Sequence, residues 1–361
     1  MKILHTEASC GWGGQEIRIL SEATGCVDRG HQVLLACPPE ARIYGEAQRA
    51  GLEVIALPIG RKNLAGFLAM RRFLAATPVD VINTHSSTDT WLAALACATL
   101  GDAPPLVRTR HISAPISANA PTRWLYGKAS AHVATTGEML RQDVIAATGL
   151  PADRVSSVPT GIDTDRYAPG NQAAARATLG LDMNATIVGI VATLRSWKGH
   201  RYLVEAVSQL PEVRLVIVGD GPQREALGQL VAELGMSERV TFPGNREDVP
   251  LWLQAFDCFV LPSYANEGVP QALMQAMSAG LPCITTLVGA IGELAKDGDT
   301  ALVVPPQDTA ALLARLQELL GDAALRQRLG ERARQHVVAS HGRATMLDRM
   351  ERIFRDVVSA R

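Results

Sequence analysis

Arg195 and Lys198 are the first residues whose charge and spacing suggest chemistry. They lie in the segment 193–200, which follows an apolar, β-branched run and leads into a helical pattern. Two cations so placed can converge on one pyrophosphate and supply positive charge that a metal ion supplies elsewhere, because hydrogen bonds between ionised groups are stronger than neutral ones. Spacing alone leaves a second interpretation open, in which both are solvated surface cations.

Glu267 is the candidate carboxylate, and the segment 262–282 places it at the entrance of a helix. A strand pattern precedes the segment, Pro270 can begin a helix, and a Gly-Leu-Pro sequence at the end of the segment stops it. The backbone at Gly268 and Val269 would then offer N–H groups and the positive end of the helix dipole to an anion.

Two glycines after the first predicted strand offer a second anion site. Gly13 and Gly14 precede a helix that begins near residue 15, so bare backbone N–H groups can face an anion there, with a simple tight turn as the alternative. Residues 11–16 and 219–224 each lack the last glycine of the dinucleotide-binding fingerprint, which disfavours NAD. His111 follows another predicted strand and, taken alone, is a partly exposed basic loop residue.

Strand and helix patterns alternate along the chain and determine where these residues would lie. In the first half, the strand patterns fall at 2–6, 32–37, 53–57, 79–84, 106–109 and 133–135. In the second half, they fall at 186–191, 213–219, 240–242, 258–261, 283–286 and 301–304. Such alternation predicts the α/β class with two Rossmann-like, doubly wound domains that face each other across a cleft.

The length of 361 residues also favours two domains, since single cores rarely organise more than about 250–300 residues. A Pro- and Gly-rich hinge at 159–170 separates an acceptor-side domain, 1–165, from a donor domain, 166–342. The tail from 343 to 361 has apolar residues at helical spacing and is expected to pack back as an amphipathic helix.

Composition limits the partners and the compartment. The net charge of −1 provides no basic field for nucleic acid. The six cysteines are scattered and no signal-peptide stretch precedes residue 10, which favours the cytoplasm. Apolar residues at 64–73, flanked by Arg and Lys, leave open a peripheral contact with the inner membrane, although Arg71 interrupts the apolar face and favours a packed helix.

No metal and no cofactor are expected. The Asp-x-Asp sequence at 163–165 lies in the predicted hinge, where Asp is a common turn residue, and the acids at 297 and 299 belong to a turn. No His, Cys, Asp or Glu group has convincing metal-ligand spacing.

The segment 262–282 resembles the signature of the retaining glycosyltransferases of family 4, in which Glu-Gly and a proline are followed by a second Glu. The resemblance covers most of residues 155–310. It extends more loosely into the first half through Gly13, Gly14 and His111. It implies the GT-B fold, which consists of two Rossmann-like domains.

The resemblance also implies roles for individual residues. Arg195 and Lys198 become ligands of the donor's diphosphate, Glu267 contacts the donor sugar, and His111 faces the donor near the reaction centre. In the family, the second acid binds the ribose of the nucleotide. This chain has Gln275 there, whose amide can still hydrogen-bond to ribose hydroxyls.

The predicted function is that of a retaining, metal-independent glycosyltransferase. It would move a sugar from a nucleotide-diphosphate donor, with UDP as the expected nucleotide, to a glycan or glycolipid acceptor. The opening residues 6–16 resemble enzymes of bacterial lipopolysaccharide or envelope polysaccharide synthesis. Two alternatives stay open: a GT-B-fold sugar-nucleotide epimerase, and a non-catalytic sugar-nucleotide-binding protein, which the departure at Gln275 motivates.

Overall fold

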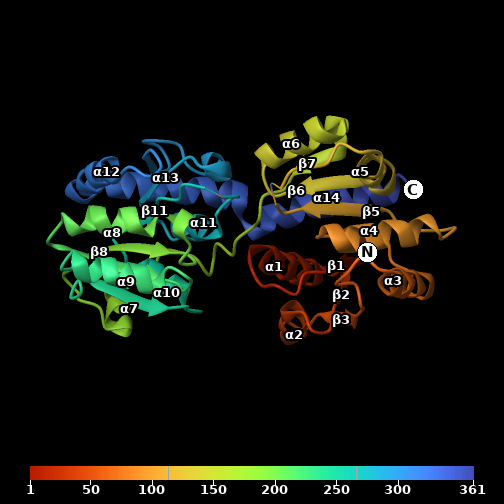
Figure 1. Cartoon of the computed structure of the whole chain (residues 1–361), viewed down its shortest axis with the longest axis horizontal. Helices are drawn as coiled ribbons and strands as arrows, with labels where there is room; N and C mark the ends of the chain where they lie inside the picture. The colour runs from red at the N-terminus through yellow and green to blue at the C-terminus, as the bar shows by residue number, and fades with distance from the viewer. Residues whose placement is uncertain (113, 266) are drawn as a thin grey trace. The chain divides into compact units, whose positions relative to one another are not determined.

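The computed structural model of the chain describes residues 1–112, 114–265 and 267–361. It divides into two compact units, each described here by itself (Figure 1). Unit 1 comprises Met1–Gly161 together with Arg343–Arg361, and unit 2 comprises Ile162–Gly342. The boundary thus lies at Gly161, a few residues before the position expected from the sequence.

Unit 1 contains a parallel sheet with the strand order β3-β2-β1-β4-β5-β6-β7 among the described residues. Its strands are β1 (Lys2–Thr6), β2 (Gln32–Cys37), β3 (Glu53–Ala56), β4 (Val81–Thr84), β5 (Leu106–Arg110), β6 (His132–Thr135) and β7 (Val155–Ser157). Strand β7 was not predicted from the sequence, because two of its three residues are serines and so short a run shows no apolar pattern.

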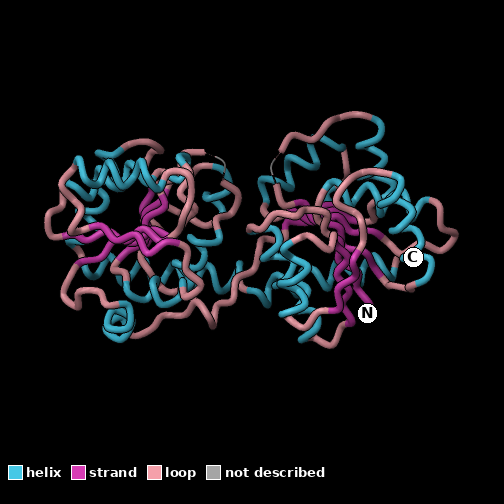
Figure 2. The backbone as a smooth tube through the Cα atoms, turned by 60° about the horizontal axis from the view of Figure 1, so that its bottom comes forward, coloured by secondary structure: helices cyan, strands magenta, loops and turns pink. Residues whose placement is uncertain are grey.

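Helices cover the sheet of unit 1 (Figure 2). They are α1 (Gly14–Asp28), α2 (Arg42–Arg49), α3 (Leu64–Ala76), α4 (Ser87–Ala98), α5 (Ala120–Trp124), which continues into a π-helical turn (Leu125–Ala129), α6 (Glu138–Thr148) and α14 (Arg343–Ser359). A 3-10 turn at Ala152–Arg154 precedes β7.

Unit 2 repeats this design with the strand order β10-β9-β8-β11-β12-β13, again parallel over the described residues. Its strands are β8 (Thr186–Val191), β9 (Val213–Val218), β10 (Val240–Gly244), β11 (Cys258–Leu261), β12 (Cys283–Thr285) and β13 (Leu302–Val303). Its helices are α7 (Gln172–Leu179), α8 (His200–Ser208), α9 (Arg224–Glu233), α10 (Val249–Ala255), α11 (Gln271–Ser278), α12 (Thr309–Gly321) and α13 (Ala323–His341), with 3-10 turns at Ser196–Lys198 and Gly289–Glu293.

The inner strands of both sheets form because their side chains are buried on both faces, whereas the edge strands β3 and β10 are partly exposed. β8 reads TIVGIV and β9 reads VRLVIV, which are the near-continuous β-branched runs typical of parallel strands covered by helices on two sides. Both strands contribute to a single apolar core in unit 2. The structure therefore confirms the predicted α/β class with two doubly wound sheets.

The last helix of the chain, α14, packs into unit 1. Its apolar stripe, which includes Met346, Met350 and Phe354, is buried in the same core as α1 and β2. The guanidinium of Arg29, at the end of α1, donates to the Asp348 carboxylate at 2.8 Å. The end of the chain is thus held in the unit that contains its beginning.

The amphipathic segment at residues 64–73 forms most of α3. Met70 and Leu74 are buried in the core and Phe67 packs against it, whereas Leu64 and Leu68 are exposed. The arrangement is that of a packed helix with two exposed leucines. In the described part of the chain, no helix combines the length and the apolar character required to cross a bilayer.

Candidate active site

In unit 2, the candidate residues lie where the strand order reverses. From β8 the chain proceeds to β9 on one side, and it later returns to the other side of β8 as β11. Ligands of doubly wound sheets bind beyond the carboxyl ends of the strands at such a point. The loop after β8 carries Arg195 and Lys198, and the loop after β11 carries Glu267.

These two loops are joined by their backbones. The amide of Tyr264 donates to the carbonyl of Trp197 at 2.8 Å. Gly199 has a φ of +75°, and a Cβ atom at this residue would lie 2.1 Å from the carbonyl oxygen of Pro262. Only glycine accommodates both the left-handed backbone and this close approach. The position of Lys198 is therefore fixed relative to the loop of Glu267.

The side chains of Lys198 and Glu267 meet directly. Lys198 Nζ lies 2.6 Å from Glu267 Oε1, and Ser263 Oγ donates to the same oxygen at 2.5 Å. The Glu267 side chain is only 4% exposed, against 18% for Lys198. A buried carboxylate is thus held by one cation and one hydroxyl. Both charged residues were predicted from the sequence, but their contact was not.

The backbone of Glu267 rests against Gly289, which no sequence pattern singled out. Gly289 begins the 3-10 turn after β12 with a φ of +61°. A Cβ atom there would lie 1.9 Å from the carbonyl oxygen of Glu267, a distance that no real side chain tolerates. The amide of Ala290 lies 3.4 Å from the same oxygen. In the sheet, β11 lies between β8 and β12. The loop after β8 thus contacts the loop of Glu267 from one side, and Gly289, after β12, fixes the Glu267 backbone from the other side.

The other residues of unit 2 that were predicted to bind the sugar donor do not take part in the contact of Lys198 with Glu267. Arg195 is exposed, with its guanidinium carbon 5.7 Å from the ring centroid of Trp197. Gly268 is exposed and Val269 partly buried, just before α11 begins at Gln271. Gln275 is partly buried within α11, and its amide makes no hydrogen bond to any described residue.

In unit 1, Gly13 and Gly14 open α1 as expected. Gly13 is the extended N-cap residue without a side-chain cap, and the helix begins at Gly14. The structure adds a carboxyl group that sequence reasoning missed. Glu7, just after β1, accepts from the amide of Ser9 at 2.7 Å and from the side chain of Gln15. Any anion at this helix end would have Glu7 nearby.

The charge of Glu7 depends on its burial. Burial raises the pKa of Glu7 to about 8, and the nearby Asp89 carboxylate adds to the rise. Glu7 is therefore mostly protonated and neutral at pH 7. A neutral acid next to the opening of α1 does not repel an anion, whereas an ionised one would.

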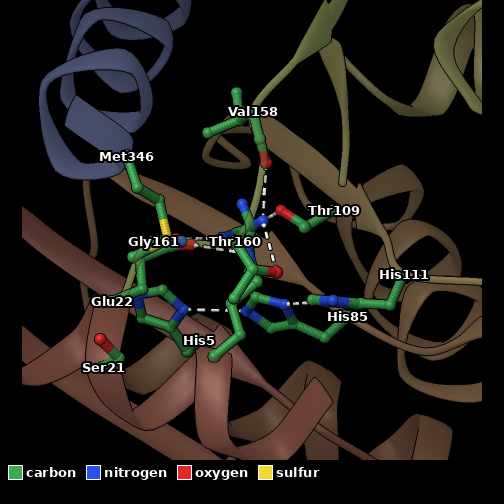
Figure 3. A network of polar contacts seen from close by, with 12 residues as sticks. His5, Ser21, Glu22, His85, Thr109, His111, Val158, Thr160, Gly161 and Met346 are labelled. Carbon is green, nitrogen blue, oxygen red and sulfur yellow. Dashed lines mark hydrogen bonds and ion pairs between the residues drawn. The ribbon is translucent and has the colours of Figure 1, made fainter. Parts of the chain in front are cut away.

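His111 is the end of a chain of three hydrogen-bonded imidazoles (Figure 3). His5 Nδ1 lies 3.0 Å from His85 Nε2, and His85 Nδ1 lies 2.9 Å from His111 Nε2. The three residues come from β1, the end of β4 and the end of β5, which are neighbours in the sheet. The sequence placed His111 at a strand end, but His5 lies within a strand and gave no signal.

A buried ion pair of Arg18 with Glu22 lies near enough to the imidazoles for the charge of Arg18 to lower the pKa of His85 and His111. Arg18 Nε is 3.6 Å from Glu22 Oε2, and Arg18 also donates to the carbonyl of Val158 at 2.6 Å. Asn83 donates to Glu22 at 2.9 Å and accepts from Thr109 at 2.8 Å. Burial lowers the pKa of Arg18 and raises that of Glu22. The network ties α1 to the chain just before the unit boundary.

Over the described residues, no group of three or more His, Cys, Asp or Glu side chains is arranged to hold a metal ion. Asp163 instead accepts from the amides of Asp165 and Arg166, which makes it a turn residue.

Two family models match the chain and together span nearly all of it. The model described as "Glycosyltransferase Family 4" matches residues 12–166, and the model described as "Glycosyl transferases group 1" matches residues 171–336. The first lies within the sequence of unit 1 apart from its last five residues, and the second lies within unit 2.

Individual proteins give the same result. A protein of Mycobacterium sp. (strain JLS) named D-inositol 3-phosphate glycosyltransferase is 30% identical over 367 residues, which cover 89% of this chain and 81% of that protein. A protein of Nocardia farcinica with the same name is 36% identical over 259 residues, which cover 64% of this chain and 57% of that protein. The structure of an Anabaena protein in complex with UDP has a TM-score of 0.84 at 22% identity and covers 99% of this chain and 100% of its own.

The two family models and the mycobacterial relative therefore identify the chain as a glycosyltransferase, and its fold has two Rossmann-like domains. The chain belongs to the glycosyltransferase family that the group 1 and family 4 models describe.

Proposed function

We propose that this enzyme transfers a sugar from a nucleotide-diphosphate donor to an acceptor hydroxyl and retains the anomeric configuration. The observation that carries the proposal is the contact of Lys198 with Glu267 at the switch point of unit 2. It places a cation for a leaving diphosphate beside a carboxylate that can orient a sugar. The role of each residue, and the retention of configuration, come from the family resemblance of residues 262–282.

The chemistry would proceed as follows. The bond from the anomeric carbon to the diphosphate oxygen breaks, a bond to the acceptor oxygen forms on the same face, and the acceptor proton leaves with the diphosphate. Negative charge grows on the diphosphate, where Lys198, Arg195 and the backbone at Gly268 would stabilise it without a metal. Positive charge grows on the sugar, where the Glu267 carboxylate favours it.

For the donor nucleotide we propose UDP. The support is that a protein of the same fold was solved with UDP bound. Gln275 lies on α11 with an amide that is not engaged by described residues, and it could hold the ribose that UDP, GDP and ADP share. A ribose hydroxyl can both donate to and accept from such an amide.

For the acceptor we propose a hydroxyl compound that carries a phosphate or carboxylate. Arg108 on β5 is 6% exposed and packs 4.3 Å from the ring centroid of Tyr126, and among the described residues it has no carboxylate within ion-pair distance. Lys62, which donates to Ser87 at 3.0 Å, is close enough that the charge of Arg108 adds to the lowering of its pKa by burial. The buried Asp89 carboxyl lies near enough to raise the pKa of both cations, but it is not in direct contact with either of them among the described residues. Two neighbouring cations that lack a directly bound carboxylate favour an anionic ligand.

This chemistry fits two sources of acceptor. An envelope glycan or glycolipid, as predicted from residues 6–16, would have such a group, and so would the inositol phosphate for which the mycobacterial relative is named. Testing myo-inositol 3-phosphate, unphosphorylated inositol and a lipopolysaccharide-core fraction with the wild type and Arg108→Gln separates them. Loss of activity toward only the anionic acceptors in Arg108→Gln is the expected result.

We propose the cytoplasm as the site of action, on the composition alone, and a peripheral contact with the inner membrane stays a prediction. The exposed Leu64 and Leu68 of α3 are the residues to test. Absence of binding to anionic liposomes at low salt would contradict the contact.

One experiment tests the central proposal against its two alternatives. The full chain is incubated with UDP-, GDP- and ADP-sugars with and without acceptor, with Glu267→Gln as the control. Acceptor-dependent release of the nucleotide, with a product whose anomeric configuration matches the donor by NMR, supports retaining transfer. Isomerised donor without acceptor indicates an epimerase. Thermal stabilisation by a donor without any turnover indicates a binding protein.

A further inference from the structure

The three imidazoles of His5, His85 and His111 share one hydrogen-bonding direction. Each of the two contacts, at 3.0 and 2.9 Å, joins Nδ1 of one ring to Nε2 of the next. In each contact, therefore, one ring nitrogen donates and the other accepts. A neutral imidazole carries one N–H donor and one acceptor. The direction of either bond therefore determines the direction of the other.

All three rings are neutral at pH 7. Burial lowers the pKa of His5 to about 3. Burial also lowers the pKa of His85 and of His111 well below the usual range, and the positive charge of Arg18 adds to both effects. The chain thus has two possible polarities: protons on the Nδ1 atoms of all three rings, or protons on all three Nε2 atoms.

The inner end of the chain distinguishes the two polarities. His5 Nε2 is buried and has no hydrogen-bond partner among the described residues, and Phe354 packs against the His5 ring with a centroid distance of 6.5 Å and a perpendicular orientation. With protons on Nε2, this atom would be a buried N–H without an acceptor. With protons on Nδ1, it is only an unused lone pair. Orphaned buried N–H groups are rarer than unsatisfied acceptors.

The middle of the chain is held rigidly. The backbone amide of His85 donates to Asp89 Oδ2 at 2.9 Å, and the same carboxylate accepts from Thr6 Oγ1 at 2.6 Å. Asp89 also forms the capping box with Ser86 at the start of α4. The ring of His85 is therefore positioned by β1 and α4 together, so His111 meets a fixed partner.

We propose that His85 and His5 are positioning residues that hold the proton of His111 on Nδ1. His111 Nε2 is then occupied as an acceptor from His85. Its outer nitrogen presents an N–H group, so that His111 offers a substrate oxygen a neutral hydrogen-bond donor and not a base. This inference rests on the proposed function only in that His111 faces the substrate; the position of the protons is independent of it.

The protons can be located without any assay of activity. In the full chain labelled with ¹⁵N-histidine at pH 7.5, ¹⁵N–¹H NMR distinguishes a protonated from an unprotonated ring nitrogen. Signals are assigned with His5→Gln, His85→Gln and His111→Asn. The expected result is Nδ1–H in all three rings. A proton on Nε2 of any of them, or a doubly protonated ring, overturns the proposal.

Variants of His85 test the coupling. His85→Leu removes the donor and should release His111 to a mixture of tautomers, whereas the amide of His85→Gln can still donate and should restore Nδ1–H. His132→Leu, which removes a ring of the same unit that hydrogen-bonds to Ser156 Oγ at 2.9 Å and lies outside the three-imidazole chain, is the matched control and should leave His111 unchanged. An unchanged His111 tautomer in folded His85→Leu contradicts the coupling.

Kinetic measurements then test whether the reaction uses the N–H group of His111. His85→Leu should lower kcat by up to about tenfold, the worth of one neutral hydrogen bond, with little change in KM for the donor and partial recovery in His85→Gln. If the wild type proves inactive, the proposed function fails while the NMR result stands. If the tautomers behave as expected but His85→Leu keeps wild-type kcat, the positioning role is wrong and the proposed function is unaffected.

Discussion

Lys198 Nζ lies 2.6 Å from Glu267 Oε1, so the cation proposed for the leaving group is ion-paired with the carboxylate proposed for the sugar. A diphosphate that binds to Lys198 gives the ammonium a second anionic partner. The Glu267 carboxylate also accepts from Ser263 Oγ at 2.5 Å, a hydrogen bond that does not involve Lys198. Each of the two charges thus depends on the other, because a buried charge that loses its partner destabilises the protein.

The first prediction separates catalysis from this mutual dependence. Lys198→Ala should lower kcat on the order of 10²–10³-fold, as the loss of a group that stabilises developing charge does. It should also lower the unfolding temperature, since Glu267 then lies buried without a cation. Arg195→Ala, which removes an exposed guanidinium, should lower kcat but leave the unfolding temperature unchanged.

A double variant completes this test. Glu267→Gln removes the charge that Lys198 neutralises, so Lys198→Ala combined with Glu267→Gln should recover most of the lost stability but none of the activity. Thermal melts and steady-state kinetics of the four proteins are the measurements. Additive losses of unfolding temperature would show that the two side chains are not coupled in solution.

The second prediction concerns the glycine behind Glu267. Gly289→Ala forces a Cβ atom toward the Glu267 carbonyl oxygen, which should displace the carboxylate and lower kcat by about tenfold or more, because small misplacements near the reaction are costly. Gly298→Ala is the matched control. Gly298 has a φ of +71°, close to the +61° of Gly289, but nothing lies within 4 Å of its added Cβ.

In both variants, an alanine in the left-handed region destabilises the folded protein by about 1–2 kcal/mol through backbone strain. Circular-dichroism melts should therefore show a loss of stability in both, and the larger loss in Gly289→Ala. Equal kcat values in the two variants would mean that Gly289 does not position Glu267.

The strands could be predicted from the sequence where they form continuous apolar runs. Strands such as β8 and β9 have continuous β-branched runs and were placed to within a residue, whereas the three residues of β7 were missed. The unit boundary at Gly161 was placed a few residues late, because Pro and Gly mark a passage and not a single residue.

The candidate site was predictable only where a residue type carries its own signal. The charged Lys198 and Glu267 stood out, but their contact depends on which loops become neighbours at the switch point. Ser263 supports Glu267 with its hydroxyl, and Gly289 does so because it has no side chain. Serine and glycine are common residues throughout the sequence, so neither stood out. His5 is the fourth of the five residues of β1. A histidine there looks like an ordinary strand residue until the fold brings His85, at the end of β4, beside it.

The third prediction is a pH dependence of stability that depends on Glu7. Its pKa is about 8 in the folded protein against an ordinary 4.5, so between these values the folded state binds a proton that the unfolded state lacks. Stability must then fall as pH rises from about 4.5 to 8, since the slope follows the protons bound by the unfolded minus the folded state. Glu7→Gln, which cannot ionise, should lack this fall.

Thermal melts between pH 5 and pH 9 measure the effect. Glu7→Gln should resemble the wild type at pH 5 and be more stable at pH 8–9, and its amide can still accept from Ser9 while Gln15 turns to offer its oxygen. Glu40→Gln, which removes an exposed acid of the same unit, should follow the wild-type curve. Parallel curves for wild type and Glu7→Gln would show that Glu7 is ionised in the folded protein.

The fourth prediction concerns Gln275, which stands where the family has its second acid. α11 begins at Gln271, and Leu273, Met274 and Ala276 are buried, so the helix is anchored by its neighbours while Gln275 remains partly exposed. A side chain on this face that contacts a ribose would do so equally before and during the reaction. Gln275→Ala should therefore raise KM for the donor more than it lowers kcat.

The substitution Gln275→Glu, which restores the family's acid, tests the same contact by strengthening it. A hydrogen bond to a charged group is worth about 1.5–3 kcal/mol and a neutral one about 0.5–1.5, so Gln275→Glu should tighten donor binding by up to about tenfold. Calorimetric titration of UDP-sugar into the wild type, Gln275→Ala and Gln275→Glu measures this. Gln229→Ala, an exposed position of α9, is the control and should bind like the wild type. Identical affinities in all four proteins would show that residue 275 does not contact the nucleotide, and the family's second acid would then have no functional counterpart in this chain.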